Sequence, residues 1–162
     1  MSCHPNIKAK VVYGTEAEQK LLPILSHVVG EPLVKTSGTF DCMDMKGAGT
    51  FAELKRRGLD FSYCDEKIKR EGWLMPSCKV IRSWTELAEG KRVFFFYYWG
   101  CDKTLWSYEM KEGDFSEGDC HFVPKGHYDN QLHVAILQER WQRVDVDLSE
   151  VVFEEEGCLI RD

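Results

Sequence analysis

The chain has 162 residues, of which 43% are hydrophobic and 30% are charged, and its formal net charge is −6. This length and apolar fraction predict one globular domain and exclude a wholly disordered chain or a collagen-like repeat. No apolar run approaches the roughly 20 residues of a membrane-spanning helix, so we expect no membrane partner. The first ten residues lack the apolar centre of a secretory signal, and the seven cysteines have no Cys-x-x-Cys spacing. We therefore expect an intracellular protein, cytoplasmic or nuclear, that is not secreted.

The negative charge is concentrated at the C-terminal end. The segment from Asp145 to Asp162 holds seven of the 27 acidic residues and one of the 21 basic residues, so the other 144 residues hold 20 of each. A negative net charge argues against nucleic acid as a partner, but a neutral body removes that objection. We accordingly divide the chain into one domain, residues 1–144, and an acidic C-terminal segment, residues 145–162. This segment would shield a basic region, guide a partner or simply solvate the end.

A helix is predicted near the start of the domain. Thr15-Glu16-Ala17-Glu18 has the form of a capping box, and apolar residues follow at helical spacing until Gly30. Pro23 predicts a kink or a break into two short helices near residue 22. Glu18 falls on the apolar stripe of this helix, whereas Glu16 falls on the solvent side. A carboxylate on a buried stripe needs a partner, and a metal site would provide one.

Strands and further helices are predicted after this helix. Residues 39–46 and 50–57 are extended runs joined by Gly47-Ala48-Gly49, which is typical of a β-hairpin. Short helices are expected over 65–71 and 83–88, with an extended stretch over 73–80 between them. Residues 93–99 (VFFFYYW) are apolar on both faces, as in a central strand, and residues 104–110 would be its antiparallel neighbour. A last strand is expected over 132–137, so the chain reads as an α/β or α+β sandwich.

The hairpin places a group of charged side chains together. Alternation puts Glu53 and Lys55 on one face of the second strand, and a loop centred on Ala48 would set Lys55 opposite Asp41. Two carboxylates can hold a hard cation such as Mg²⁺, and an ammonium can orient an attacking water or offset growing charge on phosphorus. If the turn instead holds two residues, the parity reverses and Asp44 joins Glu53.

A helix with an inward Glu18, then Asp41, then Glu53-x-Lys55 twelve residues later resembles the PD-(D/E)XK nuclease superfamily of restriction enzymes, Holliday-junction resolvases and phage exonucleases. The resemblance covers roughly residues 14–110 and extends to small nucleases of phages and large DNA viruses. It implies an α/β restriction-endonuclease-like core with a mixed central sheet flanked by helices. It also implies hydrolysis of phosphodiester bonds with Mg²⁺ or Mn²⁺. Asp41, Glu53 and Glu18 would hold the metal and Lys55 would be the catalytic lysine, although Phe40 stands where the superfamily often has proline.

Basic residues follow the predicted site. From Lys55 to Arg82 there are eight basic and four acidic residues, a local charge of +4. Such clusters neutralise phosphates, so we expect a nucleic acid partner, DNA in the first place, with contacts from the four residues Arg56, Arg57, Lys79 and Arg82. Small nuclease domains of this kind often act as dimers, which is compatible with a homodimer.

Other readings of the same sequence stay open. The strand could be surface-exposed, with Glu53 and Lys55 merely solvated. The chain could be a non-catalytic protein of nuclease fold, acting as a DNA-processing accessory, an interaction factor or an acidic inhibitor through its C-terminal segment. A small RNA-binding module that stacks bases without metal is a third reading.

Overall fold

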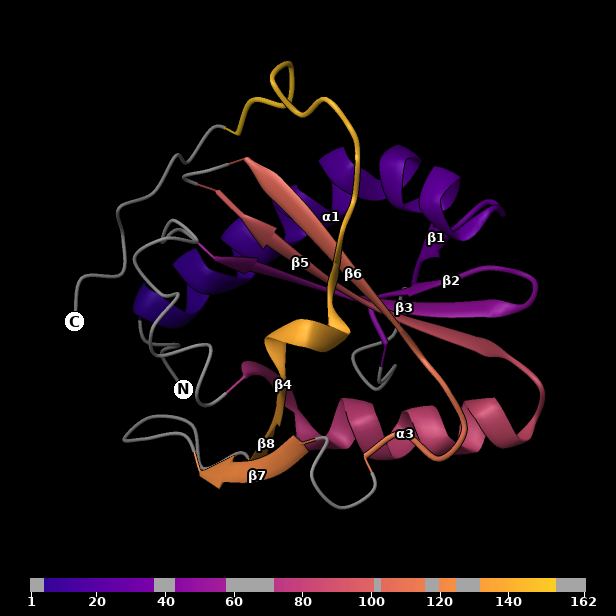
Figure 1. Ribbon diagram of the computed structural model, residues 1–162. Coiled ribbons are helices and arrows are strands. Elements are labelled where there is room, and N and C mark those ends of the chain that lie inside the picture. The colour runs from indigo at the N-terminus through magenta and orange to yellow at the C-terminus, as the bar shows by residue number, and fades with distance from the viewer. Residues whose placement is uncertain are drawn as a thin grey trace.

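A mixed sheet with a helix on each face forms the centre of the computed structural model (Figure 1). The structure describes residues 5–36, 43–57, 72–100, 103–115, 120–124 and 132–153. The two described α-helices are α1 (Pro5–Val29) and α3 (Ser77–Ala88). The strands of the large sheet are β1 (Val34–Lys35), β2 (Met45–Lys46), β3 (Thr50–Arg57), β5 (Arg92–Trp99), β6 (Thr104–Met110) and β9 (Gln142–Arg143). The predicted mixed α/β architecture is therefore confirmed.

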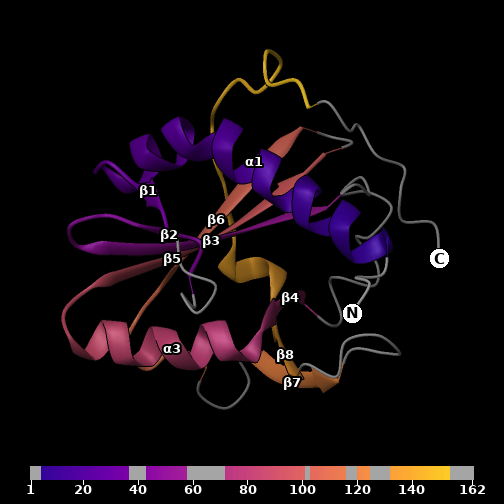
Figure 2. The same cartoon turned by 180° about the vertical axis from the view of Figure 1, so that it is seen from behind.

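The order of the large sheet is β1-β2-β3-β5-β6-β9. β3 and β5 pair in parallel, and every other neighbouring pair is antiparallel. Parallel neighbours need a crossover connection, and α3 lies in the connection between β3 and β5. α1 lies on one side of the sheet and α3 on the other, as the view from behind also shows (Figure 2).

A smaller sheet accompanies α3. It has the order β4-β8-β7, built from β4 (Trp73–Pro76), β7 (Cys120–Pro124) and β8 (Leu132–Ile136), and all its pairings are antiparallel. β4 leads directly into the N-terminal end of α3, and a 3₁₀ turn, Gln138–Arg140, follows β8. This sheet therefore ties the first turn of α3 to the rest of the domain. No helix among the described residues is both long and apolar enough to cross a membrane.

The central strand β5 separates two hydrophobic cores. Phe94, Phe96 and Tyr98 face the α1 side, whereas Phe95, Tyr97 and Trp99 belong to the core on the side of α3 and the smaller sheet. All six side chains are buried, which confirms the prediction of a central strand covered on both faces. Four tryptophans meet in the second core: Trp73 lies 4.9, 5.4 and 5.6 Å, centroid to centroid, from Trp141, Trp106 and Trp99.

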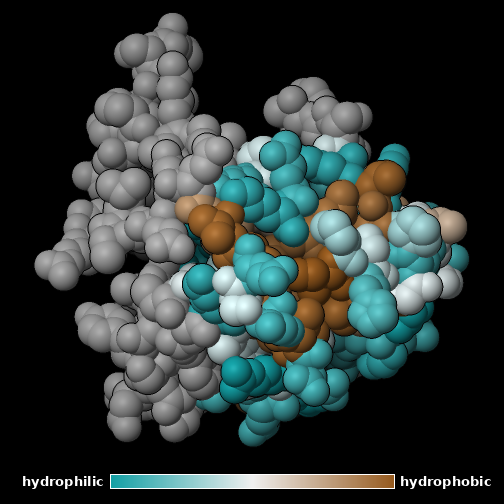
Figure 3. Space-filling model, turned by 90° about the horizontal axis from the view of Figure 1, so that it is seen from above, coloured by the Kyte–Doolittle hydropathy of each residue, from teal (hydrophilic) through white to brown (hydrophobic). Residues whose placement is uncertain are grey.

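Residues 144–153 pack on the α1 side rather than leaving the domain. Val144, Val146 and Val151 lie against the first core, and Leu148 and Phe153 are buried in it. The acidic residues Asp145 and Asp147 alternate with the valines and are exposed. Seen from this side, which is the top of Figure 1, the surface shows an apolar area framed by hydrophilic residues (Figure 3).

The boundaries of both helices differ from the prediction. α1 begins at Pro5, not at Thr15, and continues as one helix through Pro23. The exposed Pro23 deletes one backbone hydrogen bond, while the buried stripe on the opposite face, Leu21 and Leu25, keeps the helix against the sheet. α3 begins at Ser77 instead of residue 83, directly after the extended Pro76. The helix predicted over 65–71 lies outside the described residues.

Candidate functional site

The β2–β3 turn sets which residues meet across the hairpin. Met45 pairs with Ala52 and Lys46 with Phe51, and the Gly47 N–H donates to the Thr50 carbonyl at 2.7 Å. The turn therefore centres between residues 48 and 49 and not on Ala48, so the expected pairing register is wrong by one residue. Because one residue reverses parity, Asp44 is the residue beside Glu53. Asp41 lies outside the described residues.

A buried carboxylate lies at the centre of the candidate site. The Glu53 side chain has no exposed surface, and its Oε1 lies 2.8 Å from Nζ of Lys55 on the same face of β3. Its Oε2 lies 3.0 Å from Nζ of Lys79, a residue of α3. The Asp44 backbone N–H also donates to Oε2 at 3.2 Å. Glu53 is thus neutralised from two different elements, β3 and α3.

Asp44 is the second carboxylate of this group. Its Oδ2 accepts from the Leu54 N–H at 3.4 Å, and its Oδ1 lies 3.6 Å from Nζ of Lys79. The Lys79 ammonium therefore contacts both Asp44 and Glu53. We call Asp44, Glu53, Lys55 and Lys79 the carboxylate–lysine cluster.

The charges in the carboxylate–lysine cluster shift one another's protonation. Burial raises the pKa of Glu53, but the charges of Lys55 and Lys79 and their hydrogen bonds outweigh burial, so this pKa lies below its ordinary value. Burial lowers the pKa of Lys55, but the charges of Glu53 and Asp44 outweigh it and hold this pKa above its ordinary value. Burial and the charge of Glu53 raise the pKa of Asp44 to about 7. At neutral pH the cluster holds an ionised Glu53 and a charged Lys55.

Glu18 and Glu16 of α1 were predicted to face the core and the solvent, and the structure covers both. Glu18 is largely covered and its carboxylate lies 2.8 Å from Nζ of Lys35 on β1. Its charge also acts to raise the pKa of Asp44. The prediction that Glu16 faces solvent is wrong: its side chain is only 14% exposed, and its carboxylate lies 3.4 Å from the Arg56 guanidinium. Helical spacing alone could not place it, because the contact comes from β3.

The four basic residues predicted to bind phosphates divide between two faces. Arg56 lies on the α1 side, 2% exposed in its side chain, with its guanidinium 4.0 Å from the centroid of Phe153. Arg57 lies on the same face as Lys55 and contacts the Tyr97 hydroxyl at 3.4 Å. Lys79 belongs to the carboxylate–lysine cluster, and Arg82, half exposed on the next turn of α3, pairs with Glu86. The structure thus places Lys79 in the cluster and Arg57 on the same sheet face, whereas Arg56 lies behind the sheet.

The donor set of the cluster can be compared with the needs of a hard divalent cation. Among the described side chains, no group of three His, Cys, Asp or Glu residues could hold a metal ion. Asp44 and Glu53 nevertheless direct oxygens at one cation, the Lys79 ammonium, and carboxylate oxygens are the ligands that Mg²⁺ and Mn²⁺ prefer. Mg²⁺ usually keeps several waters, so two carboxylates fit it.

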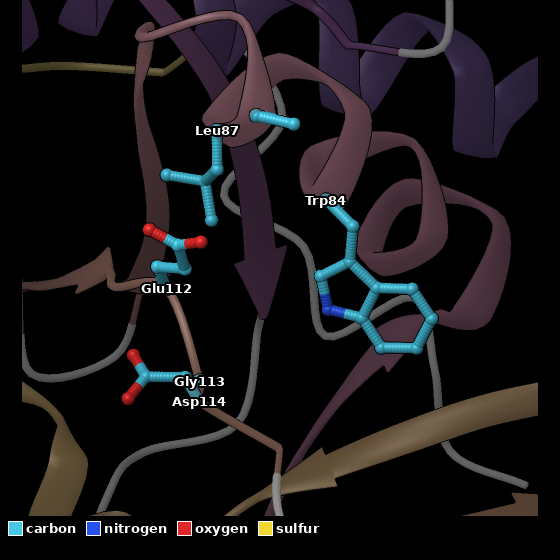
Figure 4. Close-up of a pocket in the computed structure, with 6 residues that line it drawn as sticks. Trp84, Leu87, Glu112, Gly113 and Asp114 are labelled. Atoms are coloured by element: carbon cyan, nitrogen blue, oxygen red, sulfur yellow. The ribbon is translucent and has the colours of Figure 1, made fainter.

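A surface hollow lies apart from the cluster. It measures about 320 Å³ and is lined by Trp84, Leu87, Ala88, Glu112, Gly113 and Asp114, from the second half of α3 and the residues after β6 (Figure 4). Trp84 is 46% exposed there. No member of the carboxylate–lysine cluster lines it, so the hollow adds nothing to the chemistry of that cluster.

Comparisons with known proteins do not assign the chain to a family. No protein-family model, no curated protein and no solved structure matches it.

Proposed function

We propose that this chain is a Mg²⁺- or Mn²⁺-dependent nuclease with a restriction-endonuclease-like core, which hydrolyses phosphodiester bonds of nucleic acid, DNA in the first place. The observation that carries the proposal is the convergence of Asp44, Glu53 and Lys55 at the β2–β3 hairpin. A buried carboxylate between two lysines is costly to fold and calls for a purpose. The resemblance to PD-(D/E)XK nucleases predicts an Asp followed by Glu-x-Lys, with Asp41 as the first acid, and in our proposal Asp44 takes that place.

In this proposal each residue of the site has a distinct task. Asp44 and Glu53 hold the cation, and Glu18 adds negative charge beside Asp44. The bound cation supplies an activated water and polarises the phosphate. Lys55 stays protonated at neutral pH because Glu53 and Asp44 raise its pKa, so it acts as a hydrogen-bond donor to the water or to the phosphate oxygen rather than as a base.

Basic side chains near the cluster would position the nucleic acid backbone. Arg57 shares the β3 face that carries Lys55, and Arg82 is half exposed on α3, three residues after Lys79. Arg56 is excluded from this role because its guanidinium is buried against Phe153 on the other face. We therefore expect Arg57→Ala or Arg82→Ala to weaken nucleic acid binding and reduce its salt dependence, with no such change in Arg82→Lys.

The experiment that tests the proposal is a cleavage assay. Labelled single-stranded, duplex and branched DNA and RNA are incubated with the protein and Mn²⁺, or with a chelator. Cleavage that requires Mn²⁺ and is lost in Lys55→Ala and Glu53→Gln supports the proposal, and undiminished cleavage in either variant overturns it. Glu109→Gln is the matched control, because Glu109 is a partly buried carboxylate of β6 that pairs with Arg92 of β5 and contacts no member of the carboxylate–lysine cluster in any described ion pair.

The same assay decides the first acid. Asp44→Asn is expected to abolish cleavage. Asp41→Asn is expected to retain it if Asp44 is the ligand, whereas the reverse result would return the role to Asp41.

One observation favours a second function. Glu53 is already neutralised by Lys55 and Lys79, and the described residues offer no third metal ligand to Asp44 and Glu53. An ion-pair network in which lysines already occupy both oxygens of Glu53 suits a non-catalytic protein of nuclease fold. Such a protein would act as an accessory or interaction factor through its acidic C-terminal segment. It would show no thermal stabilisation by Mn²⁺, and any nucleic acid binding would be independent of metal.

A further inference from the structure

Lys79 occupies the position at which the two carboxylates of the site converge. Its ammonium lies 3.0 Å from Oε2 of Glu53 and 3.6 Å from Oδ1 of Asp44, and the residue comes from α3 rather than from the hairpin that carries both acids. Lys55, by contrast, contacts Oε1, the other oxygen of Glu53. The two lysines therefore differ in place: Lys55 lies beside the pair of carboxylates and Lys79 lies between them.

We propose that Lys79 is an internal counter-ion that holds Asp44 and Glu53 together in the metal-free protein and leaves them when a divalent cation binds. This inference rests on the proposed metal site. It assigns Lys79 a positioning role that the hairpin motif alone does not contain, since Lys79 lies 26 residues beyond Glu53 in the sequence and reaches it through the crossover helix.

The place of Lys79 on its helix makes this exchange feasible. Lys79 is the third residue of α3, whose first turn carries no acidic residue. The N-terminal end of a helix carries partial positive charge and disfavours a cation, so the ammonium is held there by Asp44 and Glu53 rather than by its own helix. Its side chain is 17% exposed and flexible, so it has a path to solvent.

Charge balance gives the exchange a direction. Asp44, Glu53, Lys55 and Lys79 together are neutral when all four are ionised. A divalent cation can satisfy both carboxylates with twice the charge of one ammonium. The departure of Lys79 then leaves its positive charge beside the site, where a phosphate group of nucleic acid can pair with it. Cation binding and backbone binding are thereby coupled through one side chain.

The test measures binding of Mn²⁺ alone, by the electron paramagnetic resonance signal of free Mn²⁺, in wild type and three variants. Lys79→Met removes the competing ammonium and is expected to bind Mn²⁺ about tenfold more tightly than wild type, which corresponds to about 1.4 kcal/mol. Lys111→Met, which breaks the pair between an exposed lysine and Glu109 of β6, is the matched control and leaves the affinity unchanged. Glu53→Gln abolishes binding.

A second measurement uses the wild-type chain and so does not depend on how the variants fold. Acylation of lysine side chains by an N-hydroxysuccinimide ester, located by mass spectrometry, is expected to be slow at Lys79 without metal and several-fold faster with Mn²⁺. Lys91 is the internal control, with no change.

The failures of the two proposals are distinguishable. Equal or weaker Mn²⁺ affinity in Lys79→Met, while Glu53→Gln still abolishes binding, overturns the role of Lys79 and leaves the proposed metal site standing. Unchanged labelling of Lys79 in metal-loaded wild type does the same. Absence of Mn²⁺ binding in both wild type and Lys79→Met overturns the metal site, and the role of Lys79 with it.

Discussion

Lys55 donates a hydrogen bond of 2.8 Å to Glu53, a carboxylate whose side chain has no exposed surface. The two residues are neighbours on one face of β3, so the bond joins positions two apart in sequence. Lys79 supplies the other half of the compensation from α3. A buried carboxylate with two ammonium partners is tolerated in the folded state. Removal of one member leaves an uncompensated buried charge, so we expect single substitutions here to destabilise the fold more than a change that removes both charges.

We expect the pair to show strong energetic coupling. Glu53→Gln leaves two ammonium groups without their common partner and should lower the free energy of unfolding by about 2 to 4 kcal/mol. Lys55→Met should cost less, because Lys79 still neutralises Glu53. The double variant should cost less than both single changes together, with a coupling of about 1 to 3 kcal/mol, measured by urea unfolding. Single-variant effects that add to within about 0.5 kcal/mol would show that the two charges do not stabilise each other.

The second prediction concerns pH and Asp44. Burial and Glu53 raise the pKa of Asp44 from 3.8 to about 7 in the folded chain. The folded state therefore holds this proton more tightly than the unfolded state, and stability falls as pH rises from about 4 to about 7. Asp44→Asn removes this term. The variant should be more stable than wild type, and its advantage should be about 2 to 3 kcal/mol larger at pH 8 than at pH 5.

A control of opposite sign is available for this measurement. Hydrogen bonding to Arg92 lowers the pKa of Glu109, so this carboxylate contributes stability above its unfolded pKa and loses it as pH falls. The difference between Glu109→Gln and wild type should change little between pH 5 and pH 8. An Asp44→Asn difference that is equally flat over this window would contradict the raised pKa.

Two glycines with the same backbone conformation should respond differently to substitution. Gly72 and Gly90 have φ of +78° and +80°, where a side chain is strained. A Cβ on Gly72 would lie 2.7 Å from the backbone carbonyl group of Ile136, whereas a Cβ on Gly90 would meet nothing within 4 Å. Gly90→Ala should cost about 1 kcal/mol and Gly72→Ala clearly more, because β4 must also move away from β8. An equal drop in melting temperature for the two variants would mean that the close approach of Gly72 to Ile136 does not contribute to the cost of substitution.

The contrast between prediction and structure is clearest along β3 and β5. Seven consecutive apolar residues, Val93 to Trp99, identify β5 as a central strand, because a strand that is covered on both faces needs apolar side chains on both. Alternation likewise puts Glu53 and Lys55 on one face of β3. Strand burial and side-chain alternation depend on neighbouring residues only, so the sequence pattern is enough to predict them.

The partner of Glu53 across the hairpin is not a local feature. A two-residue turn is stabilised by the Glu31 carboxylate, which accepts from the Gly49 N–H at 3.1 and 3.2 Å from 18 residues upstream. This tertiary contact sets the register that brings Asp44 to Glu53. The contact between Lys79 and Glu53 depends on where the crossover helix α3 packs against the sheet. A local sequence pattern does not contain that information.

The packing of Phe153 makes the described part of the C-terminal segment, residues 145–153, part of the fold. Phe153 is 5% exposed, its ring centroid lies 5.2 Å from that of Tyr98, and the Arg56 guanidinium lies over it. We expect Phe153→Ala to lower the free energy of unfolding by about 3 kcal/mol. Val152→Ala is the matched control, because Val152 is 61% exposed, and it should cost less than about 0.5 kcal/mol. A loss at Phe153 no larger than this control would place the segment outside the core.

This packing also decides how a shielding role of the acidic end must be tested. A deletion from residue 150 would remove Val151 and Phe153 from the first core, so the deletion should begin at residue 154. Removal of residues 154–162 eliminates four acidic residues and one arginine and changes the net charge from −6 to −3. If the end shields the basic side chains, affinity for DNA should rise roughly three- to tenfold at low salt and converge with wild type at high salt. A full-length variant with glutamine at positions 154–156 should reproduce most of the rise, because charge and not length is responsible. Unchanged affinity of both variants at low salt dismisses shielding and leaves these acidic residues to partner contacts or solvation.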